Sequence, residues 1–290
     1  MWLVVGAGGQ LGRSLTKALT DAGMGNTAVT RSECDITSRS SIDAVLERVR
    51  PTIVVNTAAW TAVDAAEDNP DEAALINETG ARTLADACRA SGSRLVHIST
   101  DYVFDGSADS PIPEDATCSP RTVYGRTKRA GEIAVLEELG DMCCVIRTAW
   151  LYSEYGSNFA KTMMRRALTG TPVSVVDDQI GQPTSAHDLA RHVINLMTSG
   201  APHGIYHGTN SGRASWHEFA QSIYTLADAD ISLVSATDSS NYPTRATRPR
   251  YSVLSHARTL ANGIEGMRPW RDALAGSIDA VRDAVRSEQQ

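Results

Sequence analysis

Short apolar segments alternate with segments of helical spacing along the first half of the chain. The apolar segments are residues 2–5, 27–30, 52–56, 94–100 and 143–147, and the helical ones are 13–19, 38–49, 71–91 and 123–139. Apolar strands separated by helices are typical of parallel sheets whose strands are joined by crossover helices. The pattern therefore predicts an α/β protein built on a doubly wound parallel sheet.

Beyond about residue 150 the pattern is less regular. It predicts helices at 157–169, 186–198, 215–227 and 270–287 and a strand at 173–176. We interpret residues 1–150 as a sheet domain and residues 151–290 as a smaller, mostly helical lobe, some segments of which return to the sheet. The stretch 236–250 is irregular and contains Pro and Arg. Long irregular connections in compact domains often carry sites, so we expect a functional loop there.

A glycine-rich turn joins the first strand to the first helix. Gly6, Gly9 and Gly12 form the pattern Gly-x-x-Gly-x-x-Gly, with Gln10 and Leu11 between the last two. The glycines allow a tight turn, a close approach of the backbone to a pyrophosphate, and close packing of the helix on the strand. The helix N-terminus offers N–H groups to the phosphates. The segment predicts a dinucleotide site in a Rossmann-type fold.

The end of the second strand bears on the choice of cofactor. An acidic residue there would accept hydrogen bonds from a free 2′-hydroxyl, but the chain has Arg31 nearby. Arg31 favours NADPH over NADH because a guanidinium can stack on adenine and meet a 2′-phosphate; the alternative is a solvated loop arginine. Asp35 and Ile36 are expected at the adenine edge, and Asp35 is also a candidate N-cap for the helix at 38–49.

Residues suited to a site follow the third and fourth strands, because ligands of a doubly wound sheet bind beyond the carboxyl ends of its strands. The third strand is followed by Ala58-Ala59-Trp60-Thr61, where small residues allow the backbone to approach the ribose and pyrophosphate of the cofactor. The fourth strand ends in Thr100. Its hydroxyl can hydrogen-bond a substrate carbonyl, or it can cap the strand end.

Tyr124 and Lys128 stand four residues apart in a chain that is poor in lysine. The 27 basic residues comprise three lysines and therefore 24 arginines, so with eight tyrosines a chance Tyr-x-x-x-Lys is expected roughly 0.08 times. On a helix the two side chains share one face. An ammonium beside a phenol lowers the Tyr pKa, as a proton donor to a ketone requires; the alternative is a solvent-facing pair. His97 lies in an apolar strand and is expected to be a core residue.

Composition limits the class of protein and its partners. Over 290 residues, a hydrophobic content of 42% and a charged content of 21% describe an ordinary globular protein. The net charge of −7 argues against nucleic acid and anionic membranes as partners. The apolar runs are too short to span a membrane and Met1 leads into the first strand, so we expect no signal peptide and a cytoplasmic location. The five cysteines lack metal-ligand spacing and are expected to be reduced.

Together, the glycine turn, Thr100 and Tyr124-x-x-x-Lys128 resemble the extended short-chain dehydrogenase/reductase family, and finer motifs resemble its dTDP-4-dehydrorhamnose reductases. The finer motifs run in order through nearly the whole chain, at 9–12, 56–67, 99–104, 123–132, 147–150, 158–163, 177–184 and 243–249. The resemblance implies that NADPH reduces the C4 ketone of dTDP-4-dehydro-L-rhamnose to dTDP-L-rhamnose. A reductase of another dTDP-4-keto-6-deoxyhexose and a non-catalytic regulatory subunit of the same fold remain alternatives.

The resemblance also implies roles for individual residues. Tyr124 would give a proton to the developing alkoxide, and Thr100 would hydrogen-bond the C4 oxygen. Lys128 would hold the nicotinamide ribose and depress the pKa of Tyr124. Asp101 and Trp150 map to the substrate side, where Trp150 would shape the sugar pocket; a tryptophan in such a place is otherwise a common core residue.

Three further expectations concern residues outside this set. Arg248 and Arg250 are candidates for the substrate diphosphate, because the planar guanidinium suits phosphate oxygens; the alternative is a solvated basic loop. Asn77 matches a helix asparagine that such reductases place near the catalytic lysine. Some relatives are described as dimers bridged by magnesium through glutamates, but Ser14 stands at one of those positions. We therefore expect no structural magnesium and a monomer or weak homodimer.

Overall fold

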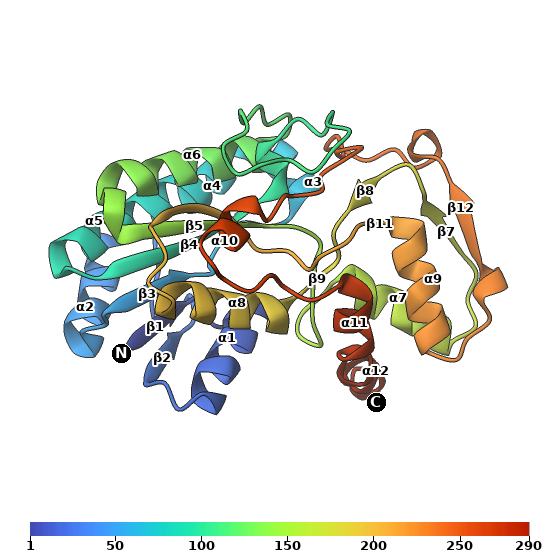
Figure 1. Ribbon diagram of the computed structural model, residues 1–290, viewed down its shortest axis with the longest axis horizontal. Helices are drawn as coiled ribbons and strands as arrows, with labels where there is room; N and C mark the ends of the chain where they lie inside the picture. Colours follow the sequence, from blue (N-terminus) through green and yellow to red (C-terminus); the bar gives the residue numbers. More distant parts are fainter. Residues whose placement is uncertain (290) are drawn as a thin grey trace.

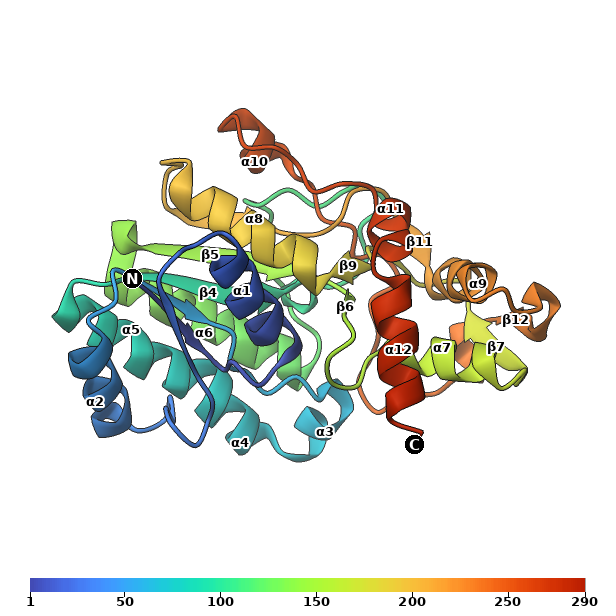
Figure 2. The same ribbon diagram turned by 90° about the horizontal axis from the view of Figure 1, so that it is seen from below.

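The computed structural model describes residues 1–289, which form two lobes side by side (Figures 1 and 2). The larger lobe contains a six-stranded sheet in the order β10-β5-β4-β3-β1-β2, in which every neighbouring pair is parallel. Its strands are β1 Trp2–Val5, β2 Asn26–Val29, β3 Ile53–Asn56, β4 Arg94–Thr100, β5 Cys143–Thr148 and β10 Gly204–His207. The predicted fold class, a Rossmann-type doubly wound sheet, is confirmed.

Helices cover both faces of this sheet. They are α1 Gln10–Asp21, α2 Arg39–Val49, α3 Val63–Asp68, α4 Pro70–Ala74 with the π-helical segment η1 Leu75–Gly80, α5 Ala81–Ser91, α6 Val123–Leu139 and α8 Ala186–Thr198. Side chains alternate along each strand, so one set of β1 residues packs under α1 and α8 and the other under α2, α5 and α6. Figure 2 shows α1 and α8 together on one side of the sheet.

The order of the strands creates a switch point between β1 and β3. The chain passes from β1 to β2 on one side and then returns to β3 on the other, so Trp2 is paired with both Asn26 and Ile53. The loops that leave β1 and β3 consequently diverge to opposite faces. A crevice at the carboxyl ends of strands at such a point is where ligands of open α/β sheets bind.

The smaller lobe is built mainly from helices around a separate apolar core that includes Phe219, Tyr224 and Trp270. Its elements are β6 Leu151–Tyr152, α7 Phe159–Leu168, β7 Val173–Val176, β8 Ile180–Gly181, β9 Thr184–Ser185, β11 Ala214–Ser215, α9 Trp216–Leu226, β12 Val234–Thr237, α11 Trp270–Ala275 and α12 Ile278–Ser287. The short helices are η2 Asp101–Val103, η3 Gly140–Met142, η4 Ile231–Leu233, η5 Ser239–Asn241 and α10 Ala257–Ala261. None of the helices within residues 1–289 is long and apolar enough to cross a membrane.

Two features differ from the predicted elements. The helix expected over 270–287 is divided between α11 and α12. Gly276 has a low helix propensity, and the Ser277 hydroxyl donates to the Ala273 carbonyl at 2.8 Å, so the helical ladder is interrupted there. The strand β10, which the sequence pattern did not indicate, joins the sheet beside β5.

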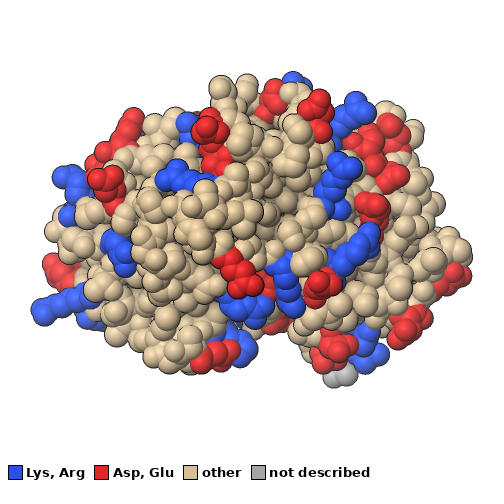
Figure 3. Space-filling model, viewed as in Figure 1, with Lys and Arg blue, Asp and Glu red and all other residues tan. Residues whose placement is uncertain are grey.

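Acidic and basic side chains are interspersed over the face shown in Figure 3.

Candidate active site

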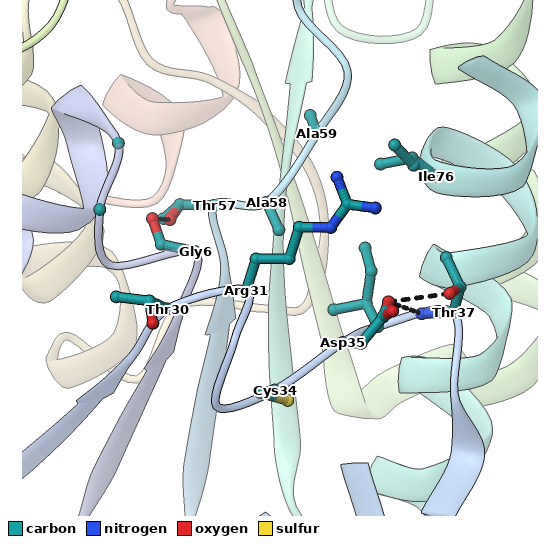
Figure 4. Close-up of a pocket in the computed structure, with 13 residues that line it drawn as sticks. Gly6, Thr30, Arg31, Cys34, Asp35, Thr37, Thr57, Ala58, Ala59 and Ile76 are labelled. Atoms are coloured by element: carbon teal, nitrogen blue, oxygen red, sulfur yellow. Dashed lines mark hydrogen bonds between the residues drawn. The ribbon is translucent and has the colours of Figure 1, made fainter. Parts of the chain in front are cut away.

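Two adjoining cavities lie at the carboxyl edge of the sheet. The first, of about 270 Å³, is lined by Gly6, Gly8, Gly9, Thr30, Arg31, Cys34, Asp35, Ile36, Thr37, Thr57, Ala58, Ala59 and Ile76 (Figure 4). The second, of about 470 Å³, lies between the lobes and shares Gly9, Thr57 and Ala59 with the first. The two together form a groove that crosses the switch point.

The glycine turn is shaped by the packing of the protein itself. Gly6 has φ +83°, and a Cβ on it would lie 2.6 Å from the Ala58 nitrogen. A Cβ on Gly12 would lie 2.5 Å from the Gly6 oxygen, so only glycine lets α1 pack this closely on the turn. Gly9 precedes α1 without a side-chain cap. The N–H groups of the first turn of α1 therefore lie free at the wall shared by the cavities, as phosphate binding requires.

Arg31 and Asp35 lie on the far side of the first cavity. Figure 4 shows the Arg31 guanidinium extended between Ala59 and Ile76. Asp35 Oδ1 accepts hydrogen bonds from the N–H and the hydroxyl of Thr37 at 2.9 and 2.8 Å, which lower the pKa of Asp35. The expectation that Asp35 caps α2 is wrong, because the Ser38 hydroxyl is the acceptor at that helix end. The Asp35 side chain instead forms a local turn by accepting from the backbone N–H two residues further on, that of Thr37.

Seven chain segments converge on the second cavity. It is lined by Gly9, Gln10, Leu11, Thr57, Ala59, Thr61, Val63, Ile98, Ser99, Thr100, Asp101, Tyr102, Tyr124, Lys128, Thr148, Ala149, Trp150, Leu151, Tyr152, Ser157, Asn158, Phe159, Trp216 and Phe219. The three predicted catalytic residues, Thr100, Tyr124 and Lys128, are thus brought to one wall. Trp150 and Trp216 come from the smaller lobe and bound the opposite side.

Thr100 and Asp101 lie where β4 passes into η2. The Thr100 hydroxyl donates to Asp101 Oδ1 at 2.9 Å and accepts from the Tyr102 N–H at 3.2 Å. Asp101 is 2% exposed, and its Oδ2 has no hydrogen-bond partner among residues 1–289. Burial raises the pKa of Asp101 to about 6, although the nearby Ser252 hydroxyl and the hydrogen bond from Thr100 act in the opposite direction. The site therefore contains a carboxyl group that holds its proton unusually well.

The first turn of α6 fixes Tyr124. The Thr122 hydroxyl caps the helix by accepting from the Gly125 N–H at 3.0 Å, and Glu67 Oε1 accepts from the Val123 N–H at 2.8 Å. Burial raises the pKa of Tyr124 to about 12, while the nearby Thr100 hydroxyl acts in the opposite direction. Its phenol is therefore protonated throughout the neutral range.

Lys128 lies one turn further along α6 and is 2% exposed. Its ammonium donates to the Ile98 carbonyl at 2.6 Å. Burial lowers the pKa of Lys128 to about 8, with the Glu132 carboxylate acting against the shift. The expectation that Lys128 depresses the pKa of Tyr124 is contradicted here, since burial dominates both groups and the ammonium is directed at a backbone carbonyl.

Asn77 and Trp60 lie behind the cavity walls. Asn77 Oδ1 accepts from the Trp60 N–H at 2.9 Å, and its amide donates to the Thr127 hydroxyl at 3.0 Å and to the Trp60 carbonyl at 3.1 Å. Neither residue lines either cavity. The cofactor-binding roles predicted for these two residues stay predictions. Asn77 ties the loop after β3 to α6, next to Lys128.

Trp150 adopts a conformation that is rare for an aromatic residue. Its φ is 46°, in the left-handed region, and its ring stacks on Trp216 with centroids 3.5 Å apart and planes 8° apart. A Cβ on Gly181 would lie 2.5 Å from Trp150 Cε2, so glycine makes room for the indole. Strained backbone is found preferentially at functional sites. The Trp150 side chain forms a rigid aromatic wall of the second cavity.

The two arginines expected at the diphosphate differ in position. Arg248 lies beside Tyr102 in a small recess, and its guanidinium forms an ion pair with Asp64. Its Nη1 is buried without a partner among the described residues. Arg250 is exposed and lines neither cavity. Neither arginine lines the two cavities, so their role as phosphate ligands stays a prediction; Arg248, with its buried and unpaired Nη1 beside Tyr102, is the better placed of the two.

Among the side chains of the second cavity that were not predicted as site residues are Asn158, Phe159, Trp216 and Phe219. Asn158 caps α7 and donates to Gln10 Oε1 at 2.9 Å, so it joins the two lobes. Trp216 follows the capping box of Ser215 and Glu218. These cap patterns are visible in the sequence as helix starts. Nothing local indicates that both helix starts face the sheet.

Metal ligands and disulfides do not contribute to this site. Within residues 1–289, no group of three or more His, Cys, Asp or Glu side chains is arranged to hold a metal ion. All five cysteines are free thiols. His97 is buried in β4, as expected of a core residue, with its ring nitrogen Nδ1 3.3 Å from the Asn56 amide.

A glycine turn at the switch point of a doubly wound sheet, beside a cavity that holds Thr, Tyr and Lys in the Tyr-x-x-x-Lys arrangement, defines a short-chain dehydrogenase/reductase. The particular family follows from comparison with known proteins. The family model described as "RmlD substrate binding domain" matches residues 1–283, and the chain belongs to this family.

Named relatives and a solved structure agree with this assignment. The chain is 48% identical over 284 residues to a dTDP-4-dehydrorhamnose reductase of Streptomyces griseus, covering 97% of this chain and 93% of that protein. It is 46% identical over 273 residues to a dTDP-4-keto-6-deoxy-D-glucose reductase of Streptomyces niveus, covering 94% of each. The crystal structure of a Bacillus anthracis dTDP-4-dehydrorhamnose reductase in complex with NADP has a TM-score of 0.91 and 37% identity, covering 96% of this chain and 98% of that one.

Proposed function

We propose that this protein uses NADPH, or less favourably NADH, to reduce the C4 ketone of dTDP-4-dehydro-L-rhamnose to dTDP-L-rhamnose. The observation that carries the proposal is the convergence of Thr100, Tyr124 and Lys128 on one cavity that opens from the glycine turn. A nicotinamide and a ketone can meet there beside a protonated phenol. The two relatives compared above are, by their names, reductases of such dTDP sugars.

The residues of the first cavity fit a phosphorylated dinucleotide. Gly6, Gly9 and the free N–H groups at Gln10 and Leu11 would hold the pyrophosphate, and Ala58 and Ala59 leave room for the ribose. Arg31 supports NADPH, because its guanidinium lies in the cavity where a 2′-phosphate needs a cation. The cofactor, when bound, supplies the hydride. Residues 1–150, together with β10 and α8, would hold the cofactor, and the rest of residues 151–290 would complete the sugar-nucleotide site.

The second cavity supplies the proton. Tyr124 is buried and protonated at neutral pH, so it can donate to the oxygen that becomes an alkoxide. A donor already aimed at that oxygen stabilises the transition state by roughly 3–4 kcal/mol. Lys128 would hold the nicotinamide ribose. Asp101 and Trp150 would contact the sugar, and Arg248 would meet the diphosphate.

A second candidate is reduction of another dTDP-4-keto-6-deoxyhexose. It is favoured by the Streptomyces niveus relative, whose identity of 46% is close to the 48% of the Streptomyces griseus protein. The stereochemistry of the product depends on the shape of the sugar pocket rather than on the proton donor.

Product analysis tests both candidates. The protein is incubated with NADPH and either dTDP-4-dehydro-L-rhamnose or dTDP-4-dehydro-6-deoxy-D-glucose, cofactor oxidation is followed, and the product is identified by NMR. We expect turnover of the first substrate to dTDP-L-rhamnose. Tyr124→Phe should lower kcat by roughly 10²–10⁴ without loss of NADPH affinity, whereas Tyr242→Phe, on a side chain that is 63% exposed, should not. Absence of cofactor oxidation with either sugar would refute the proposal.

A further inference from the structure

The Thr100 hydroxyl has one proton to donate. Asp101 Oδ1 competes for this proton with an oxygen in the cavity, that of the ketone or of Tyr124. A hydroxyl offers one donor and two acceptor positions. Here the proton is directed to Asp101 Oδ1 at 2.9 Å, and one acceptor position is taken by the Tyr102 N–H at 3.2 Å. Thr100 cannot donate to a ketone or to the oxygen of Tyr124 while Asp101 holds its proton. The protonation state of Asp101 therefore decides what Thr100 does.

Asp101 is placed to carry an exchangeable proton. It is 2% exposed and takes part in none of the ion pairs between residues 1–289. Its titratable neighbours are the phenols of Tyr102 on its own segment and Tyr124 on α6, while Arg248 and Asp64 act on Tyr102 from the loop and from α3. No cation thus compensates a carboxylate here, and burial moves the pKa of Asp101 to about 6.

The second oxygen of Asp101 faces another unpaired group. Asp101 Oδ2 and the Ser252 hydroxyl are both buried without a hydrogen-bond partner among the described residues. The Ser252 side chain nevertheless lies near enough to lower the pKa of Asp101. Asp101 also lines the second cavity. A proton taken up at Oδ2 is brought to Thr100 when the carboxyl group rotates about its Cβ–Cγ bond.

We propose that Asp101 restores the proton of Tyr124 after each reduction, through the hydroxyl of Thr100. This inference rests on the proposed ketone reduction. Tyr124 gives its proton to the ketone oxygen as hydride reaches the carbon, which leaves a phenolate. The phenolate takes the proton of Thr100, and Thr100 takes the proton of the Asp101 carboxyl, which leaves Asp101 as a carboxylate. A proton from water then restores Asp101, so charge and protons balance over the cycle. Asp101 is a proton-relay residue, and Thr100 is the bridge.

The rates of the first and of later turnovers separate this role from plain substrate contact. In rapid-mixing experiments with NADPH and the dTDP-4-keto sugar, the first hydride transfer uses a Tyr124 that is already protonated. Later turnovers depend on its reprotonation. Asp101→Asn should raise the ratio of first-turnover rate to steady-state kcat at least about tenfold, and a solvent deuterium effect should be larger in steady state than in the first turnover. Thr100→Val should raise the same ratio and Thr100→Ser should restore it. Asp105→Asn should leave the ratio unchanged, because Asp105 lies two residues beyond the end of η2 and accepts a hydrogen bond from the Ser107 N–H.

The pH dependence gives an independent readout. In the unmodified protein, steady-state kcat should fall as pH rises through about 6 to 7, because ionised Asp101 cannot supply a proton; Asp101→Asn should lack this descent. An unchanged ratio, or a change in KM alone, would overturn the relay and leave Asp101 as a substrate contact. If the unmodified protein oxidises NADPH with the sugar while the ratio stays constant, the proposed function stands and the relay is wrong. If it does not oxidise NADPH, both are wrong.

Discussion

Replacing Asp101 with asparagine should stabilise the folded protein more at neutral pH than in mild acid. The pKa of this carboxyl is raised from 3.8 to about 6, chiefly by burial. A rise of about two units corresponds to about 3 kcal/mol of differential interaction between the two protonation states. Because the folded-state pKa is the higher one, the contribution to stability is fully present below 3.8 and is lost as pH rises through about 6.

The magnitude can be worked out for two accessible conditions. At about pH 4.5 the unmodified protein retains about 2 kcal/mol of this contribution, and at about pH 7.5 almost none. An asparagine at position 101 does not titrate. The nearby Ser252 hydroxyl, which has no hydrogen-bond partner among the described residues, would be an acceptor for the new amide. The difference in unfolding free energy between the variant and the unmodified protein should therefore grow by about 2 kcal/mol over this range. For a chain of this size that is about 4 °C in Tm.

Thermal unfolding followed by circular dichroism at several pH values measures this difference. Asp105→Asn is the control, because hydrogen bonds from Ser107 lower the pKa of Asp105 and its titration is complete below this pH range. The control should show a constant offset from the unmodified protein. A gap for Asp101→Asn that stays constant or narrows toward neutral pH would refute the idea that an uncompensated buried carboxylate lies in the cavity.

Three other substitutions test the turn, the cofactor side and the core. Gly12→Ala should lower Tm and NADPH affinity, because its Cβ would lie 2.5 Å from the Gly6 oxygen. Gly8→Ala, whose Cβ meets nothing within 4 Å, should keep the Tm of the unmodified protein. Equal Tm values for the two variants would contradict the packing argument. Arg31→Ala should lower the ratio of kcat/KM for NADPH over NADH at least about tenfold, and an unchanged ratio would remove Arg31 from the phosphate site. Glu132→Gln should lower the free energy of unfolding in denaturant by about 3–5 kcal/mol, because it leaves the buried Arg147 guanidinium without its carboxylate. Glu137→Gln, at an exposed ion pair, should lower it by less than about 1 kcal/mol. Similar losses in the two variants would argue against the buried pair.

Elements whose limits are set locally were predicted well from the sequence. The helices at 123–139 and 186–198 were predicted to the residue, because each has a signal within its own segment: the Thr122 cap for the first and an amphipathic period for the second. The strand β10 was missed since it has four residues and forms only by pairing with β5. The break between α11 and α12 was missed because a periodic apolar face continues on both sides of it.

The predictions for the site differ in the same way: motifs within one segment were predicted, and contacts between segments were not. The glycine turn and the Tyr-x-x-x-Lys pair are contained in short segments, and the residues proposed from them line the two cavities. The arginine loop was harder, because the partner of Arg248 is Asp64 on α3, 184 residues away in sequence. The buried pair of Glu132 and Arg147 spans only 15 residues but joins two different elements, α6 and β5, with Arg147 Nε donating to Glu132 Oε1 at 2.8 Å. Contacts between separate elements depend on the finished fold.

Electrostatics at Tyr124 show what spacing leaves undetermined. Four residues on a helix bring a phenol and an ammonium to one face, and this placement is found. The spacing does not specify how much water reaches them, and burial raises the pKa of Tyr124 to about 12 while lowering that of Lys128 to about 8. A phenolate formed here by proton donation is consequently a strong base, and a carboxyl with a pKa near 6 returns a proton to it with a large driving force. The motif identifies the group that gives the proton to the sugar, whereas the source of the next proton depends on how β4 and η2 place Thr100 and Asp101 beside it.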